Sequence, residues 1–210
     1  MYDALLFDLD GTLIDTESLA MASGLQAFAD VGHPVELDFL HRLIGIDQPS
    51  SVHLIRNHRP DIDLEALNSH WGAGFRARLD DGLDLKPGTS ELLATAPGHL
   101  HRAVVTSSSR KEAHRKIGIA GLAPSFATVV TVDDVAKAKP NPEPYLLAAR
   151  LLGVDPARCL VFEDSETGAE SAHRAGCVVV QVPDIVPASG RWAHHVAIDL
   201  MSGARLAGLF

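Results

Sequence analysis

The chain has 210 residues, of which 46% are hydrophobic and 21% are charged, and its formal net charge at pH 7 is −9. This length and composition fit a soluble α/β protein with one inserted subdomain. The acidic balance argues against a nucleic-acid partner, which would call for a basic patch, and no apolar run reaches the roughly 18 residues of a membrane-spanning helix.

The two cysteines and the N-terminus predict where the protein works. Cys159 and Cys177 show neither metal-ligand spacing nor a disulfide framework, which favours a reducing compartment. The first residues lack the basic segment of a signal peptide. We therefore expect a soluble, cytoplasmic protein without a membrane partner. The sequence leaves the oligomeric state open, and a monomer is compatible with it.

Short runs of β-type residues alternate with helical patterns along most of the chain. The expected strands are residues 4–7, 103–105, 128–132, 159–162 and 178–182. The expected helices among them are residues 90–96, 111–117, 142–152 and 166–175, with Gly153 and Gly176 at two of the C-termini. This alternation predicts an α/β fold, a Rossmann-like parallel sheet with helices on both faces. The histidine pair at 194–195 is expected on a surface loop.

Residues 17–84 interrupt the alternation. They contain no convincing strand, and their helical patterns cover residues 19–31, 39–43, 51–57 and 64–79. We interpret this stretch as an α-helical cap inserted after the first strand. In this interpretation, residues 1–15 and 86–210 form the α/β catalytic core and residues 16–85 form the cap, with hinges near residues 13–16 and 84–87.

Acidic and hydroxyl side chains follow three of the expected strands. Asp8 and Asp10 follow the first strand, residues 106–108 (TSS) follow the second, and Glu163 and Asp164 follow the fourth. Ligands bind at the carboxyl ends of strands in an open α/β sheet, so four carboxylates would share one crevice. Carboxylates this close repel one another unless a cation holds them, and oxygen ligands suit Mg²⁺. Each segment alone also fits a turn or a helix cap; only their coincidence indicates a site.

Four segments in this order resemble the motifs of the haloacid dehalogenase superfamily. DLDGTLIDT at residues 8–16 resembles the opening motif, and VVTSSSR at 104–110 the second. AKPNPEPY at 138–145 resembles the third, and LVFEDSETGAESAHRAG at 160–176 the fourth. The helical insertion is similar to the small cap of the subgroup that contains β-phosphoglucomutase and phosphoglycolate phosphatase.

The resemblance implies a Mg²⁺-dependent phosphatase that acts on a small phosphorylated metabolite through an aspartyl-phosphate intermediate. Asp8 would be the nucleophile, and Asp10 the general acid and then the general base. Thr106 and Lys139 would hold the phosphoryl oxygens. Lys137 is the less favoured candidate for this lysine, because Lys139 directly precedes a proline as the family pattern requires.

The resemblance also implies a metal site and further substrate contacts. Asp8, Asp164 with Glu163 beside it, and the backbone carbonyl of Asp10 would hold the metal. Gly11 would let the backbone approach the phosphate closely. Two serines, Ser107 and Ser108, would either contact phosphate or cap the following helix, and two loop residues, Thr12 and Asp15, are expected to brace the loop.

The cap of such proteins closes over the site and selects the leaving group. The candidates here are Glu17, the loop at Gly45, Arg56, and Arg76 or Arg78. A cap arginine could clamp a second charged group of a substrate. For each arginine taken singly, a solvated helix face is the competing interpretation.

Other activities share these motifs. A sugar phosphomutase of the β-phosphoglucomutase type would have a histidine in the cap hinge, where this chain has LAM at 19–21, and its absence favours hydrolysis. A dehalogenase or a phosphonatase would lack Asp10, and a phosphonatase also needs a cap lysine, of which residues 1–85 contain none. A non-catalytic binding module would have lost at least one motif residue. The sequence does not choose among sugar phosphates, phosphoglycolate and nucleotides.

Overall fold

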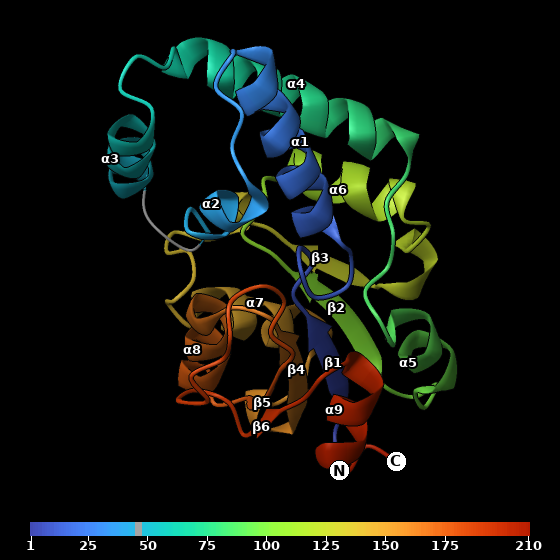
Figure 1. The fold of residues 1–210 in the computed structure, drawn as a ribbon. Coiled ribbons are helices and arrows are strands. Elements are labelled where there is room, and N and C mark those ends of the chain that lie inside the picture. The colour runs from blue at the N-terminus through green and yellow to red at the C-terminus, as the bar shows by residue number, and fades with distance from the viewer. Residues whose placement is uncertain (45–47) are drawn as a thin grey trace. The chain divides into compact units, whose positions relative to one another are not determined.

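The computed structural model describes residues 1–44 and 48–210 (Figure 1). These residues form two compact units, one of Met1–Asp15 with Asp84–Phe210 and the other of Thr16–Leu83. Among the helices of the described residues, none combines the length and the apolar character needed to cross a membrane.

The larger unit is built on a parallel sheet of six strands in the order β3-β2-β1-β4-β5-β6. The strands are β1 (Ala4–Phe7), β2 (His101–Val105), β3 (Thr128–Val130), β4 (Cys159–Glu163), β5 (Val178–Gln181) and β6 (His195–Val196). At the centre of the sheet, Leu6 of β1 pairs with Ala103 of β2 and Val161 of β4. The chain order reverses between β1 and β4, and ligands bind outside the carboxyl ends of strands at such a point.

Helices cover both faces of this sheet, as Figure 1 shows for α7 and α8 on one side and α5 and α9 on the other. Leu6 packs in one core cluster with Tyr145 of α7 and Ala169 of α8, whereas Gly203 of α9 lies against the Val180 side chain. The helices are α5 (Thr89–Thr95), α6 (Arg110–Ile119), α7 (Glu143–Leu152), α8 (Glu166–Arg174) and α9 (Leu200–Leu206), with short 3₁₀ turns η1 (Ala123–Ser125), η2 (Val132–Asp134) and η3 (Pro156–Arg158). The predicted Rossmann-like α/β class is confirmed.

Within the described residues of the smaller unit, the regular elements are all helices. It contains α1 (Thr16–Asp30), α2 (Leu37–His41), α3 (Gln48–His58) and α4 (Leu64–Asp81). It has a core of its own, in which the fully buried Phe28 meets the ring of Phe39 edge-on. The indole N–H of Trp71 on α4 donates to the carbonyl of Ala20 on α1 at 2.9 Å. The aromatic side chains are packed within the unit, and the polar N–H of Trp71 has a hydrogen-bond partner there.

The two segments where the larger unit is interrupted run side by side. Ile14 and Leu85 form an antiparallel bridge. The N–H of Asp15 donates to the carbonyl of Asp84 at 2.9 Å, and the N–H of Lys86 donates to that of Leu13 at 3.0 Å. The chain therefore leaves and re-enters the larger unit at neighbouring, hydrogen-bonded positions.

The C-terminal part differs most from the sequence-based expectation. The expectation of a surface loop at 194–195 was wrong, because His195 begins the edge strand β6 and pairs with Val180. His194 lies just before β6, and its Nδ1 accepts the backbone N–H of Val179 at 3.0 Å. The α9 helix was not predicted. Strand β3 ends at Val130, two residues early, because η2 follows it.

Candidate active site

The carboxyl ends of β1, β2 and β4 open into a cavity of about 280 Å³. Six of the predicted site residues line it: Asp8, Asp10, Thr106, Ser107, Lys139 and Asp164. Ser108 and Ser165 complete its wall. All of these side chains belong to the larger unit, so the cavity is formed within one compact body.

The loop after β1 places Asp8 and Gly11. The N–H of Asp8 donates to the carbonyl of Phe162 at 3.0 Å and continues the sheet pairing. Gly11 has a φ of +81°, and a Cβ there would lie 2.7 Å from Oδ2 of Asp164. Only glycine tolerates both the left-handed backbone and this close approach. Gly11 thus packs under the Asp164 carboxylate, and it is not among the residues that line the cavity.

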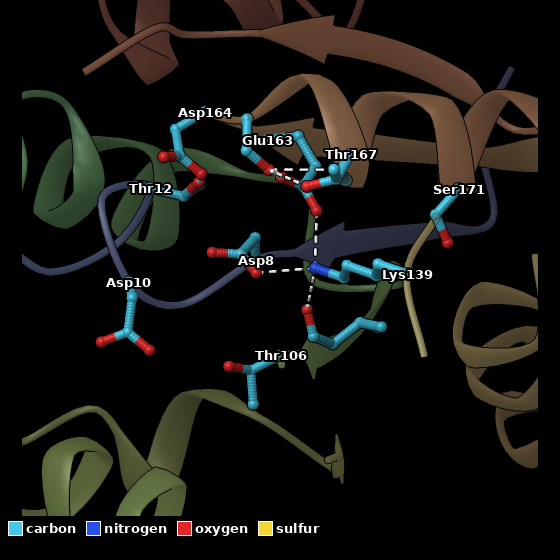
Figure 2. Close-up of polar contacts among 12 residues, drawn as sticks. Asp8, Asp10, Thr12, Thr106, Lys139, Glu163, Asp164, Thr167 and Ser171 are labelled. Atoms are coloured by element: carbon cyan, nitrogen blue, oxygen red, sulfur yellow. Dashed lines mark hydrogen bonds and ion pairs between the residues drawn. The ribbon is translucent and has the colours of Figure 1, made fainter. Parts of the chain in front are cut away.

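Lys139 links two of the carboxylates (Figure 2). Its Nζ donates to Oδ1 of Asp8 and to Oε1 of Glu163, each at 2.6 Å, and to the carbonyl of Val105 at 2.8 Å. Burial alone would lower the pKa of Lys139, but the neighbouring Asp8 and Glu163 carboxylates raise it above the ordinary lysine value. The side chain is therefore a fixed ammonium. Lys137, the alternative lysine, is exposed.

Glu163 lies beneath the cavity, fully buried at the end of β4. Besides Lys139, its carboxylate accepts the hydroxyl of Tyr145 at 2.6 Å and that of Ser165 at 3.1 Å. Burial raises the pKa of Tyr145 well above the ordinary value, and the charge of Glu163 raises it further. Three donors thus hold this carboxylate in place.

Asp8, Glu163 and Asp164 could hold a metal ion, since one oxygen from each lies within 4.8 Å of the others. Burial raises the pKa of Asp8 well above its usual range; Lys139 opposes this shift, while Glu163 and Asp164 add to it. Burial and the charge of Glu163 raise the pKa of Asp164 to about 7. A bound cation would stabilise the charged form of these carboxylates and so lower their pKa. Thr12 braces the cluster by donating to Oδ1 of Asp164 at 3.3 Å.

The charges around the cavity also fit a divalent cation. Five carboxylates face three ammonium groups here, in the pairs Lys139 with Asp8 and Glu163, Lys116 with Asp10, and Lys86 with Asp184. Among the described residues, no ammonium or guanidinium group pairs with Asp164. The site thus has two more carboxyl groups than ammonium groups, and a bound cation would favour the charged form of Asp8 and Asp164. Oδ2 of Asp184 is buried without a hydrogen-bond partner in this region, and an all-oxygen donor set of this kind suits Mg²⁺.

The Asp10 carboxylate has partners of its own, separate from those of the metal candidates. Figure 2 shows its carboxylate pointing away from that of Asp8, as two residues on one bent segment allow. Oδ2 of Asp10 accepts the hydroxyl of Ser108 at 2.8 Å, and Oδ1 accepts Nζ of Lys116 at 2.7 Å. The Asp10 carboxylate is not part of the cluster of Asp8, Glu163 and Asp164. The metal ligand expected from Asp10 is its backbone carbonyl, and that role stays a prediction.

The predicted cap residues belong to the smaller unit or lie outside the described residues. Glu17 is half-buried in the first turn of α1, and Arg56 and Arg76 are exposed on α3 and α4. Arg78 is used within the unit, where it donates to the carbonyl of Gly74 at 3.3 Å. Gly45 lies outside the described residues. A role in substrate selection stays a prediction for all of these cap residues.

Five charged or polar side chains at the site were missed from the sequence: Lys86, Lys116, Tyr145, Ser165 and Asp184. Tyr145 ends the segment that resembles the third motif, where a partner for a buried carboxylate could have been sought. Lys116 stands on the apolar stripe of α6, between the buried Ala113 and Ile117, and that break in the pattern was a readable signal. Asp184 follows β5 at the same sheet edge as the other carboxylates.

Comparison with known proteins shows which family the chain is similar to. Residues 5–182 match the family described as haloacid dehalogenase-like hydrolase. The fructose-1-phosphate phosphatase YqaB of Escherichia coli is 30% identical over 86% of this chain and 96% of its own. Hexitol phosphatase A of Escherichia coli is 35% identical over 84% of this chain and 81% of its own.

A solved structure is similar as well. A Thermotoga maritima protein assigned as a β-phosphoglucomutase superposes with a TM-score of 0.82 and 26% identity, over 98% of each chain. This similarity covers the whole fold, and the family match over residues 5–182 includes the carboxyl ends of β1, β2 and β4. The chain belongs to the haloacid dehalogenase-like hydrolases, and it is an enzyme whose curated relatives include phosphatases.

Proposed function

We propose that the protein is a Mg²⁺-dependent phosphatase that hydrolyses a small phosphorylated metabolite through an aspartyl-phosphate on Asp8. The observation that supports this most is the bridge from Lys139 to Asp8 and Glu163 at 2.6 Å, beside a three-carboxylate cluster. Transfer of a phosphoryl group to a carboxylate uses such a combination of a nucleophile, a fixed cation and metal ligands. Sugar phosphates are the substrate class, in line with the names of two relatives, fructose-1-phosphate phosphatase and hexitol phosphatase A.

Asp8 would act first. One of its carboxylate oxygens forms a bond to phosphorus while the bond from phosphorus to the ester oxygen breaks, and the carboxyl proton of Asp10 moves to that leaving oxygen. Lys139 and Thr106 would bind the phosphoryl oxygens. When bound at Asp8, Asp164, Glu163 and the carbonyl of Asp10, Mg²⁺ would supply the charge that lets an anionic nucleophile approach an anionic phosphate.

Asp10 would act again in the second half. As a carboxylate, it accepts a proton from water, whose oxygen attacks the phosphorus of the aspartyl-phosphate. The bond from phosphorus to Asp8 breaks, which releases inorganic phosphate and restores both side chains. Two side chains thus divide one difficult displacement into two easier steps.

The smaller unit would act as the cap, with Glu17, Gly45 and Arg76 as the substrate-selecting candidates. Its independent core, centred on Phe28, supports movement as a body. The hydrogen-bonded segments at residues 13–15 and 84–86 support a pair of hinges. A closed cap would exclude water from the aspartyl-phosphate until the alcohol has left.

The direct experiment measures turnover of p-nitrophenyl phosphate and of a panel of hexose phosphates, with Mg²⁺ and with EDTA. We expect metal-dependent turnover, abolished by Asp8→Asn because an amide is a poor nucleophile. Asp10→Asn should lower kcat by about 10²-fold to 10⁴-fold, the range for a positioned acid–base group. Metal-independent turnover, or near-wild-type activity of Asp8→Asn, would refute the mechanism.

A sugar phosphomutase is the second candidate function, because the Thermotoga maritima structure is assigned as a β-phosphoglucomutase. Residues 19–21 in α1 are Leu, Ala and Met, so the hinge histidine expected of a mutase is absent, which favours the phosphatase. Incubation with β-glucose 1-phosphate and the corresponding bisphosphate separates the two. Glucose 6-phosphate formed faster than free phosphate would identify a mutase.

A further inference from the structure

Lys116 occupies a position that a lysine rarely takes. It lies on α6 between Ala113 and Ile117, on the face that the helix buries, and only 8% of the residue is exposed. Lysine is almost never this buried unless its charge is paired. Placing an ammonium group here costs desolvation free energy that an apolar residue would not cost. The burial of Lys116 therefore calls for an explanation at its charged end.

The ammonium group of Lys116 forms hydrogen bonds with two residues that line the cavity, and these two residues also bind each other. Nζ of Lys116 lies 2.7 Å from Oδ1 of Asp10 and 3.1 Å from Oγ of Ser108. The hydroxyl of Ser108 in turn donates to Oδ2 of Asp10 at 2.8 Å. Each oxygen of the Asp10 carboxylate is thus held by its own donor, so both the rotation of the carboxylate and its position are fixed.

We infer that Lys116, acting with Ser108, is the residue that positions Asp10 for acid–base catalysis. This inference rests on the proposed phosphatase function. Lys116 does not line the cavity, so its contact with the reaction runs through Asp10. Ser108 has a single hydroxyl proton, which it gives to Asp10, while its oxygen accepts from Lys116. Ser108 therefore supports Asp10 and does not donate to the substrate phosphate in this arrangement.

The chemistry of the two half-reactions explains what this support does. When the ester bond breaks, the proton of Asp10 passes to the leaving oxygen and Asp10 becomes an anion. The charge-assisted hydrogen bond from Lys116 stabilises that anion and keeps it where the incoming water will need a base. Without Lys116, Asp10 would still be present, but it would be less well aligned in both steps.

The test compares Lys116→Met with Lys116→Arg, and with Lys111→Met as the matched control. Lys111 is an exposed lysine on the same helix. Two substrates are used: p-nitrophenyl phosphate, whose leaving group departs without a proton, and the hexose phosphate that the wild-type protein turns over fastest. Thermal melting establishes that each variant is folded.

We expect Lys116→Met to lower kcat/KM for the hexose phosphate by about 10-fold to 100-fold, the size of a misalignment effect. The kcat/KM for the aryl ester should change much less, because its kcat and its KM fall together when the second step becomes rate-limiting. The slower second step should produce a burst of nitrophenolate as aspartyl-phosphate accumulates. Lys116→Arg should restore part of the loss, and Lys111→Met should resemble wild type.

A double variant makes the inference sharper. In an Asp10→Asn background, Lys116→Met should add almost no further loss, because residues that act through one group are not additive. Equal loss on both esters without a burst, wild-type behaviour of Lys116→Met, or a full extra loss in the Asp10→Asn background would each overturn the inference.

Failure of the proposed function is recognised separately, as a wild-type protein without metal-dependent turnover of any ester. Crystal structures of wild type and Lys116→Met then decide the positioning role by themselves. A shifted Asp10 carboxylate in the variant supports it, and an Asp10 unchanged on Ser108 overturns it.

Discussion

The pKa values of individual side chains at the site depend strongly on their burial and on the charges around them. Asp8 and Asp164 both hold protons more tightly than free aspartate because they are buried and face other carboxylates. Lys139, buried beside them, is kept charged by the same carboxylates. One cluster therefore raises the pKa of both its acids and its base, and a bound cation would favour the charged form of the two acids.

A histidine away from the site gives a pH prediction at the residue scale. Burial lowers the pKa of His194, with repulsion from His173 and His195 adding to the effect, and its neutral Nδ1 accepts the N–H of Val179. The folded protein thus binds this proton more weakly than the unfolded chain does. The stabilisation is present above the unfolded pKa of about 6.5 and is lost as the pH falls through the lower folded value.

Urea unfolding at pH 7.5 and pH 5.5 measures this effect. His194→Asn, which keeps an acceptor but cannot titrate, should lose less stability over this interval than wild type loses. The same substitution at His99, an exposed loop residue, should keep the wild-type dependence. Equal pH dependence in wild type and His194→Asn would contradict the prediction.

At the scale of elements, helix α8 is positioned by the carboxylate it covers. A Cβ on Gly168 would lie 1.9–2.0 Å from the carboxylate atoms of Glu163. Glu163 cannot move aside easily, because Lys139, Tyr145 and Ser165 hold it. The absence of a side chain at Gly168 therefore allows α8 to pack directly over the buried end of β4.

Gly168→Ala should accordingly destabilise the protein by about 1–3 kcal/mol, as overpacking does, and should lower activity by displacing Glu163. The matched control is Gly118→Ala in α6, where a Cβ would meet nothing within 4 Å. There the helix propensity of alanine should stabilise by about 0.5–1 kcal/mol. Urea denaturation gives both values, and destabilisation of equal size at the two glycines would argue against the packing account.

At the scale of the whole molecule, the unbalanced charge of the site couples metal binding to folding. The carboxyl groups of the site, which outnumber its ammonium groups, are brought together only when β1, β4 and the loop after β5 assemble. A cation that binds the folded form alone stabilises it by about 2.7 kcal/mol at a hundredfold excess over Kd. The protein should therefore unfold at a higher temperature in Mg²⁺ than in EDTA.

Asp184→Asn tests whether this coupling depends on the buried, unpartnered Oδ2 of that residue. We expect Mg²⁺ affinity to fall by about 10-fold to 100-fold, the usual effect of an outer-shell partner, as measured by calorimetry and by the Mg²⁺-induced rise in Tm. Glu91→Gln, which removes an exposed charge from the same unit, should leave both measurements unchanged. An unaltered Mg²⁺ response in Asp184→Asn would remove Asp184 from the site.

The sequence by itself determined the fold class and most of the cavity wall. Short runs of β-type residues identified five strands of the sheet, and short motifs directly after the strands must meet at one edge when the strands are parallel. That is why Asp8, Thr106 and Asp164 could be placed together without coordinates. The two-residue β6 was beyond reach, since it is too short to have a period and exists only because β5 offers an edge to pair with.

Only the tertiary structure decided the partners that come from distant elements. Lys116 reaches Asp10 across 106 residues of chain and Lys86 reaches Asp184 across 98, and neither pair stands in any local pattern. Which oxygen each ammonium binds depends on how α6 and the segment before α5 pack against the sheet. Local sequence fixes which residues follow a strand, whereas packing fixes which charges then meet, because the free energy of pairing appears only once both groups are buried together.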